Sequence, residues 1–515
     1  MARFEMDVSG PKIAEYSNKA STTLYFVKKS TYVLTGILLA LLCAIVLVIG
    51  TIDIYISGAC ALAGDLYLLW LSGRPRNLQD VDRSEGIAPL FLVALVPLLA
   101  STPLAFFGLL GSPIEAFLRI CMATGFSIAL FISSFPSLLA IKFKIKEQHR
   151  ERQSSRKPLV SILVPAYNEQ EVISRTLESL MSLKYDRKEI IVIDDGSTDM
   201  TGAVAAWYKQ YGVKVLSKPN GGKASALNYG MLFASGEVVI TIDSDSMVEI
   251  GAIDEVVSLM EDPNVVAVAG NIRVLNSKSL LTRIQELEYV MAINTIRRAF
   301  ALFGTVMVVP GAFGVFRKQD VVNVGSYDKD TLTEDFDLTI KLLKTGGVVD
   351  SSSCGMAYTE VPSTWKALYK QRLRWNTGTF QTISKHRDAL LNKRYGLLHS
   401  FVFPMLLLSI FNPVTSYIAL VSGIALSLSG HLFLFLKMEL LFLLVQLVVS
   451  LVSLSLDEER YSLAVYSPFF VVIYKQFIDF TTVISAVRAL LKTKKEWNKI
   501  DRSGGTQAIK ISRGN

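Results

Sequence analysis

Hydrophobic positions along the chain gather in two blocks that enclose a stretch of mixed character. A helix needs about 20 mainly apolar residues to cross the hydrocarbon layer of a bilayer, and most runs in both blocks approach that length. The pattern predicts four membrane-spanning helices before the central stretch and six to eight in total. The runs are Tyr32–Ile49, Ile54–Leu71, Ala88–Leu110 and Ile114–Ile141, then Tyr395–Phe411, Pro413–Leu428, Leu432–Leu454 and Ala464–Leu490. The Asn412-Pro413 break allows Tyr395–Phe411 either to cross or to lie in the interface.

Between the two blocks, short β-branched runs alternate with helical stretches. Such alternation predicts an α/β domain with a mostly parallel sheet and helices on both faces. In sheets of this kind, ligands bind beyond the carboxyl ends of the strands. The predicted strands are Leu159–Val164, Glu189–Ile193, Val213–Leu216, Glu237–Ile242 and Val265–Val268, and the helices include Glu171–Leu183 and Ala252–Met260.

Composition and charge narrow the class of protein. Of 515 residues, 51% are hydrophobic and 19% charged, which argues against a purely cytosolic or disordered chain. The net charge of +8 is small and dispersed, so nucleic acid is not an expected partner. The four cysteines and four histidines are scattered, which argues against a disulfide framework or a zinc site. Basic residues before the first run and after the fourth place the N-terminus and the stretch from Lys142 to Arg394 in the cytoplasm.

Acidic residues follow two of the predicted strands. Asp194 and Asp195 end the second strand before a Gly-Ser-Thr turn, where they either face a ligand or cap the next helix. Asp243 and Asp245 follow the fourth strand and, being two residues apart on an extended chain, project together. Two carboxylates at a strand end suit Mg²⁺ or Mn²⁺. A solvated turn is the ordinary alternative.

Two further motifs carry charge. The Gly-rich segment from Lys218 to Lys223 is a basic loop that can hold a diphosphate, although it lacks the P-loop pattern. Glu334 and Asp335 lie at the predicted start of a helix that ends at Gly346-Gly347. One of these two carboxylates is a candidate general base, and ordinary helix-start chemistry is the alternative.

Gln371, Arg374 and Trp375 share one face of a predicted amphipathic helix. A guanidinium can clamp a phosphate, and an indole offers a flat surface to a sugar ring. A helix lying on the membrane surface with basic side chains would show the same pattern.

Taken in this order, the motifs resemble the membrane-embedded processive β-glycosyltransferases of family 2, which include cellulose, hyaluronan, chitin-oligosaccharide and poly-N-acetylglucosamine synthases. The segments Pro310–Gly314 and Thr333–Thr339 are most similar to the last two. The resemblance implies a GT-A-type, Rossmann-like glycosyltransferase domain inserted between two multi-span helical blocks. The expected organisation is a cytoplasmic segment 1–30, a four-span block 31–142, a cytoplasmic catalytic domain 158–394, a second block 395–491 and a cytoplasmic tail 492–515.

The resemblance also implies roles for individual residues. Asp335 matches the catalytic base, with Glu334 beside it, and Asp243 and Asp245 match the metal-binding pair for Mg²⁺ or Mn²⁺. The other implied substrate-binding residues are Ala166, Tyr167, Glu169, Asp194 and Asp195 for the nucleoside, Lys223 for its phosphates, Gln371, Arg374 and Trp375 for the diphosphate and acceptor, and Trp497 and Arg502, with Lys499, in a gating segment.

The implied reaction is an inverting transfer from a UDP-sugar, similar to UDP-GlcNAc, to a growing β-linked polysaccharide. The expected location is the plasma membrane, and the polymer is expected to leave through the enzyme's own helices. Lys475 and Asp479 either line that path or form a neutral pair within one helix. The alternative function is the addition of one sugar to a lipid, either a polyprenyl phosphate or diacylglycerol. An accessory export subunit is left open.

Overall fold

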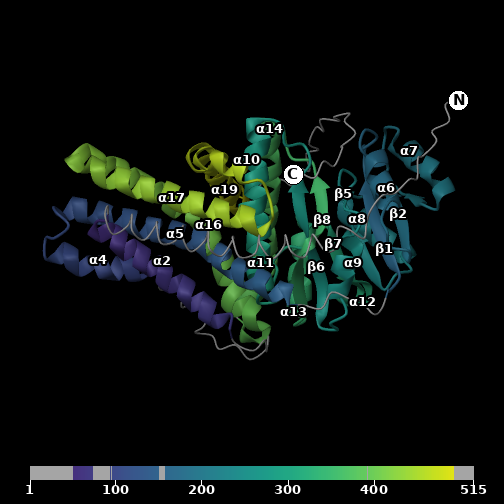
Figure 1. The fold of residues 1–515 in the computed structure, drawn as a ribbon, viewed down its shortest axis with the longest axis horizontal. Coiled ribbons are helices and arrows are strands. Elements are labelled where there is room, and N and C mark those ends of the chain that lie inside the picture. The colour runs from purple at the N-terminus through teal and green to yellow at the C-terminus, as the bar shows by residue number, and fades with distance from the viewer. Residues whose placement is uncertain (1–49, 74–92, 94, 150–156, 391, 492–515) are drawn as a thin grey trace, which may run out of the picture. The chain divides into compact units, whose positions relative to one another are not determined.

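The computed structural model describes residues 50–73, 93, 95–149, 157–390 and 392–491 (Figure 1). The first predicted apolar run, much of the third and the segment 492–515 lie outside this part of the chain.

All five predicted strands form, and they belong to one eight-stranded sheet of order β3-β2-β1-β4-β7-β6-β8-β5. The alternation of buried β-branched residues explains why these segments are extended. The strands are β1 (Val160–Ala166), β2 (Lys188–Asp194), β3 (Lys214–Ser217), β4 (Val238–Thr241), β5 (Met247–Val248), β6 (Val265–Val274), β7 (Gly314–Arg317) and β8 (Val348–Thr359).

The sheet is mixed, which differs from the mostly parallel sheet expected. Strands β1 to β4 pair in parallel, but β7 runs antiparallel between β4 and β6. β7 was not predicted because only four residues form it, directly after the Pro310–Phe313 turn. β8 was missed because its serines and glycine have weak strand propensity, and pairing with β6 decides its conformation.

Helices pack on the sheet and continue into the segment that leads to the second apolar block. Leu177 of α6 and Val256 of α9 are fully buried in the sheet's main hydrophobic core. The helices are α6 (Ile173–Met181), α7 (Thr201–Trp207), η2 (Tyr208–Tyr211), α8 (Lys223–Phe233), α9 (Ala252–Leu259), α10 (Leu280–Glu288), η3 (Tyr289–Asn294), α11 (Thr295–Ala301), α12 (Lys318–Asn323), α13 (Glu334–Lys344), α14 (Trp365–Lys385), α15 (Arg387–Leu390) and η4 (Lys393–Tyr395).

Apolar helices precede and follow the sheet. By length and composition, four helical segments among the described residues can cross a membrane: Ile52–Leu71, Pro113–Gln148, Leu398–Leu456 and Tyr461–Ala489. The long helix α5 packs against both α2 and α16. The elements are α2 (Ile52–Leu71), α4 (Val96–Phe106), α5 (Pro113–Gln148), η5 (Leu398–Val402), α16 (Phe403–Leu426), η6 (Ser427–His431), α17 (Leu432–Leu456), η7 (Tyr461–Tyr466), α18 (Ser467–Phe469), η8 (Phe470–Tyr474) and α19 (Lys475–Leu490).

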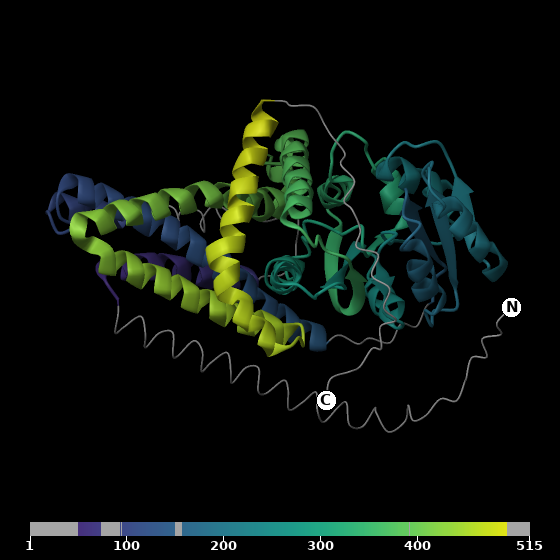
Figure 2. The ribbon, with the colours of Figure 1, turned by 90° about the horizontal axis from the view of Figure 1, so that it is seen from above.

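The Asn412-Pro413 break does not end a helix. α16 continues through Pro413, because in an apolar environment a helix is the local way to pair the backbone groups. The chain turns back instead at Gly430, whose φ of 94° is readily adopted only by glycine. Figure 2 shows α16 and α17 leaving this turn in opposite directions, so Leu398–Leu456 supplies two apolar stretches.

A buried ionic network joins the sheet to the loop after α17. Asp457 is 4% exposed and accepts hydrogen bonds from Asn271 of β6 (2.9 Å), Asn294 of η3 (3.2 Å) and Arg298 of α11. Burial opposes ionisation of Asp457, but the charge of Arg298 outweighs it and lowers the pKa of this carboxyl. The loop between two apolar helices is therefore fixed to the strands that carry the site.

Candidate functional site

The ends of β1 and β2 lie together at one edge of the sheet. Ala166 and Asp194 are paired in register, and the Asp195 amide donates to the Ala166 carbonyl at 2.9 Å. Next to them, the backbone amide of Glu169 donates to Thr201 Oγ1 at 2.7 Å, and Tyr167 is half-buried. The residues predicted to form a nucleoside pocket are thus brought together.

Asp195 organises the Gly-rich loop. Its carboxylate accepts the backbone amides of Gly221 (3.1 Å) and Gly222 (2.7 Å) and pairs with the Lys218 ammonium. Neither Asp194 nor Asp195 caps the next helix, because the Thr201 amide at the start of α7 donates to Asp199 instead. Of the two interpretations open from sequence, helix capping is wrong.

Four charged side chains from three elements converge beside this loop. Lys223 is the first residue of α8, and its Nζ lies 2.5 Å from Asp243 Oδ1 and 3.3 Å from Glu334 Oε1. Burial alone would lower the pKa of Lys223, but Asp243, Glu334 and Asp335 outweigh it and raise that pKa. The lysine is therefore a fixed positive charge.

Asp335 is the titratable member of this group. Burial, followed by the neighbouring charge of Glu334, raises the pKa of Asp335 to about 6, against the opposing effect of Lys223. The Phe336 amide donates to Asp335 Oδ1 at 2.8 Å and orients the carboxyl. A carboxyl with this pKa can accept a proton near neutral pH, as a general base requires.

Asp243 and Asp245 lie in the turn between β4 and β5. Asp245 is 3% exposed, and Ser246 Oγ donates to its Oδ1 at 3.3 Å. Asp243 Oδ1 already attracts the Lys223 cation, so the turn concentrates negative charge that a divalent ion can neutralise. The donor set, hard carboxylate oxygens at a strand end, fits Mg²⁺ or Mn²⁺.

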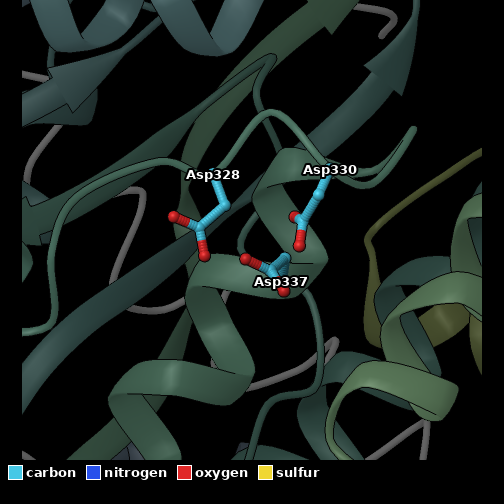
Figure 3. A group of neighbouring side chains, drawn as sticks. All are labelled: Asp328, Asp330 and Asp337. Carbon is cyan, nitrogen blue, oxygen red and sulfur yellow. The ribbon is translucent and has the colours of Figure 1, made fainter.

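A second acidic group lies nearby on a loop and on α13 (Figure 3). Among the described residues, Asp328, Asp330 and Asp337 bring carboxylate oxygens close enough to share one ion. However, Lys385 Nζ lies 2.6, 2.9 and 3.0 Å from them in that order, and His386 Nε2 lies 2.9 Å from Asp337. A lysine ammonium thus neutralises this group, which we interpret as structural.

The predicted amphipathic helix forms as α14, capped by Thr364, whose Oγ1 accepts the Ala367 amide at 3.2 Å. Gln371 is 8% exposed, and its Oε1 has no hydrogen-bond partner among the described residues. Trp375 is half-buried and packs against the core of the sheet. Since a buried amide oxygen without a partner is costly, Gln371 Oε1 is suited to a ligand donor.

The comparison with protein families identifies the domain. Residues 161–325 match the model of Glycosyl transferase family 2. The chain contains a family 2 glycosyltransferase domain. The matched residues include Lys223, Asp243 and Asp245 and end before Asp335. Together with the mixed sheet, the match confirms the predicted GT-A-type domain flanked by apolar helices.

Curated relatives of this family 2 chain carry one name. Over 252 residues the chain is 36% identical to a poly-beta-1,6-N-acetyl-D-glucosamine synthase of Staphylococcus aureus (strain COL), covering 48% of this chain and 60% of the relative. It is 34% identical over 242 residues to the synthase of that name from Staphylococcus epidermidis, covering 46% and 58%. The match thus spans about three fifths of the relatives' length.

Among solved structures, the mannosyltransferase PcManGT of Pyrobaculum calidifontis in complex with GDP-Man and Mn²⁺ aligns with a TM-score of 0.49 and 18% identity. That alignment covers 72% of this chain and 100% of the other.

Two side chains beside the family 2 site were not predicted. Burial lowers the pKa of Arg297 on α11 to about 10, with Tyr289 and Asp335 opposing, so a second cation faces the base. Tyr327 is buried, and burial and Glu334 raise its pKa. Adjacent arginines at 297 and 298 within an otherwise apolar segment were the available signal. Trp497 and Arg502, predicted in a gating segment, lie outside the described residues.

Proposed function

We propose that the protein is a membrane-bound polymerising N-acetylhexosaminyltransferase that uses a UDP-sugar. The observation that carries this proposal is the convergence of Lys223, Asp243, Glu334 and Asp335 from α8, the turn after β4 and α13. The family match and the name shared by the relatives support the reaction class and the polymer.

Asp335 is the base in the proposed inverting reaction. It takes the proton of the acceptor hydroxyl, whose oxygen forms a bond to the anomeric carbon of the donor sugar. The bond from that carbon to the diphosphate oxygen breaks on the opposite face, and its electron pair leaves with the nucleoside diphosphate. Lys223 and Arg374 stabilise the negative charge that develops there.

Asp243 and Asp245 hold Mg²⁺ or Mn²⁺ in this proposal. Bound there, the ion supplies positive charge against the diphosphate. Lys223, now paired with Asp243, is free to turn toward the phosphates once that carboxylate has another cation. This exchange keeps the turn neutral with and without donor.

The two sides of the site divide the substrates. Ala166, Tyr167, Glu169, Asp194 and Asp195 hold the nucleoside, with the Tyr167 ring stacked on uracil. Gln371 and Trp375 hold the acceptor: the buried Gln371 oxygen takes a sugar hydroxyl, and the indole lies along the ring. An acceptor sugar held in this way is the end of the growing chain.

We further propose that the catalytic domain faces the cytoplasm of the plasma membrane and that the apolar helices secrete the product. A cavity of about 80 Å³ lies between α5, α16, α17 and α19, with Ser416, Glu439, Lys475 and Gln476 in its wall. Since a water takes about 30 Å³ in the liquid, this space holds a few waters and no sugar ring. Passage of a polymer therefore requires these helices to separate.

Sugar incorporation by purified protein tests the proposed base. Replacement of Asp335 by Asn should lower transfer from labelled UDP-GlcNAc by about 10²–10⁴-fold, because it removes the general base. UDP binding should stay normal. Asp186→Asn, at an exposed loop position, is the matched control and should keep full activity. Near-normal transfer by the Asp335 variant would refute the assignment.

A further inference from the structure

Three buried side chains form a closed hydrogen-bonded triangle behind the proposed acceptor site. Arg372 Nη2 lies 2.5 Å from Glu288 Oε2 and 3.1 Å from Tyr474 Oη, and the Tyr474 hydroxyl donates to the same Glu288 oxygen at 2.6 Å. Arg372 and Glu288 are 5% and 8% exposed, and Tyr474 is fully buried. Each polar head is therefore held from two sides.

The triangle joins three elements that are far apart in sequence. Glu288 ends α10 directly before the π-helix η3, Arg372 lies on α14, and Tyr474 ends η8 where the chain enters α19. α14 and α19 lie side by side (Figures 1 and 2). A second bond, from Asn376 Nδ2 to Thr482 Oγ1 at 3.0 Å, ties the same two helices one turn further along.

Arg372 also contacts the indole of Trp375. Its guanidinium carbon lies 4.3 Å from the centre of the ring, within the range of a cation–π interaction. Glu288 and Tyr474 fix the guanidinium, and the guanidinium in turn fixes one face of the indole. The position of Trp375 thus depends on a residue at the start of the last apolar helix.

Stability alone does not account for this arrangement. A buried ion pair is a weak stabiliser, because desolvation of both charges offsets their attraction, and hydrophobic residues of equal volume often serve as well. Directional bonds, in contrast, set the plane of the guanidinium and hence the plane of the ring stacked on it.

We propose that Arg372 is a positioning residue that holds Trp375 for the acceptor sugar, and that Tyr474 couples this position to the last apolar helix. This inference rests on the proposed function. Arg372 does not touch the reacting atoms; it acts through Trp375. A shift of α19 then changes how the acceptor is held while leaving the nucleotide side of the site unchanged.

The test separates acceptor binding from donor binding. Purified Tyr474→Phe and Arg372→Met are assayed for transfer from UDP-GlcNAc to a short N-acetylglucosamine oligosaccharide, for hydrolysis of the donor without acceptor, and for UDP binding. Since a cation–π contact of this kind corresponds to about a 2- to 30-fold change in an equilibrium, we expect the acceptor KM to rise by that factor. Donor hydrolysis and UDP affinity should be unchanged.

Two comparisons keep the result decisive. Lys366→Met, at an exposed position of α14, is the matched control and should leave every value unchanged. Tyr474→Phe removes only a hydroxyl, so it tests the coupling even where Arg372→Met does not fold. An unchanged acceptor KM in Tyr474→Phe, or equal losses of acceptor and UDP affinity, would overturn the inference. Absence of transfer by the unmodified protein would instead refute the proposed function.

Discussion

Gly311 sets the space available to the Lys223 ammonium. A β-carbon at position 311 would collide with Lys223 Nζ and lie 3.2 Å from Asp243 Oδ1. Both atoms end flexible side chains, so Gly311→Ala should displace the ammonium from between Asp243 and Glu334 without straining the backbone. The lysine bonds Asp243 at 2.5 Å, and a hydrogen bond between charged groups contributes about 1.5–3 kcal/mol.

The expected effect on catalysis follows from that energy. If displaced Lys223 no longer reaches the leaving diphosphate, kcat for transfer from UDP-GlcNAc should fall about 10- to 200-fold. The unfolding temperature should be nearly unchanged.

The matched control is Gly251→Ala, because an added β-carbon there meets no atom within 4 Å. It should keep both full activity and full stability. A Gly311→Ala variant with normal kcat would contradict the role given to Lys223. A large loss of stability would show instead that the backbone, and not the ammonium, had yielded.

Three further outcomes are expected. Transfer should decline as the pH falls through about 6, because protonated Asp335 cannot act as a base; Glu334→Gln should move this decline to lower pH by removing the charge that helps to raise the Asp335 pKa, as initial rates from pH 5 upward will show. Chelation of divalent ions should abolish transfer, and Asp245→Asn should raise the Mn²⁺ concentration for half-activation at least about tenfold, by loss of one charged ligand. Asp457→Asn should destabilise the protein by about 3–5 kcal/mol, seen as a lower unfolding temperature in detergent, because Arg298 stays buried without a charged partner.

Local patterns predicted much of the fold. The five strands have β-branched residues at buried positions, and α14 and α13 begin near the predicted residues, because periodicity and turn chemistry act over a few positions. β7 and β8 depend on partners far along the chain. Their short or serine-rich sequences carry little local signal, so the direction of β7, and with it the mixed sheet, could not be predicted.

The site shows the same division. Acidic residues at strand ends located Asp195, Asp243 and Asp335 along the sequence, yet their contacts did not follow from it. Asp195 holds the Gly-rich loop through two amides, and Arg372, an unspecified position within the Gln-x-x-Arg-Trp motif, is the arginine that contacts the indole. Both contacts depend on how α8, α14 and η8 pack, which no local pattern encodes.

The most direct test of the proposed function is the size of the product made by the purified, unmodified protein from radiolabelled UDP-GlcNAc and Mg²⁺. We predict label in material of high molecular mass that organic solvent does not extract. Label confined to a single sugar on an extractable lipid, or no incorporation at all, would contradict the proposal that this chain polymerises N-acetylhexosamine.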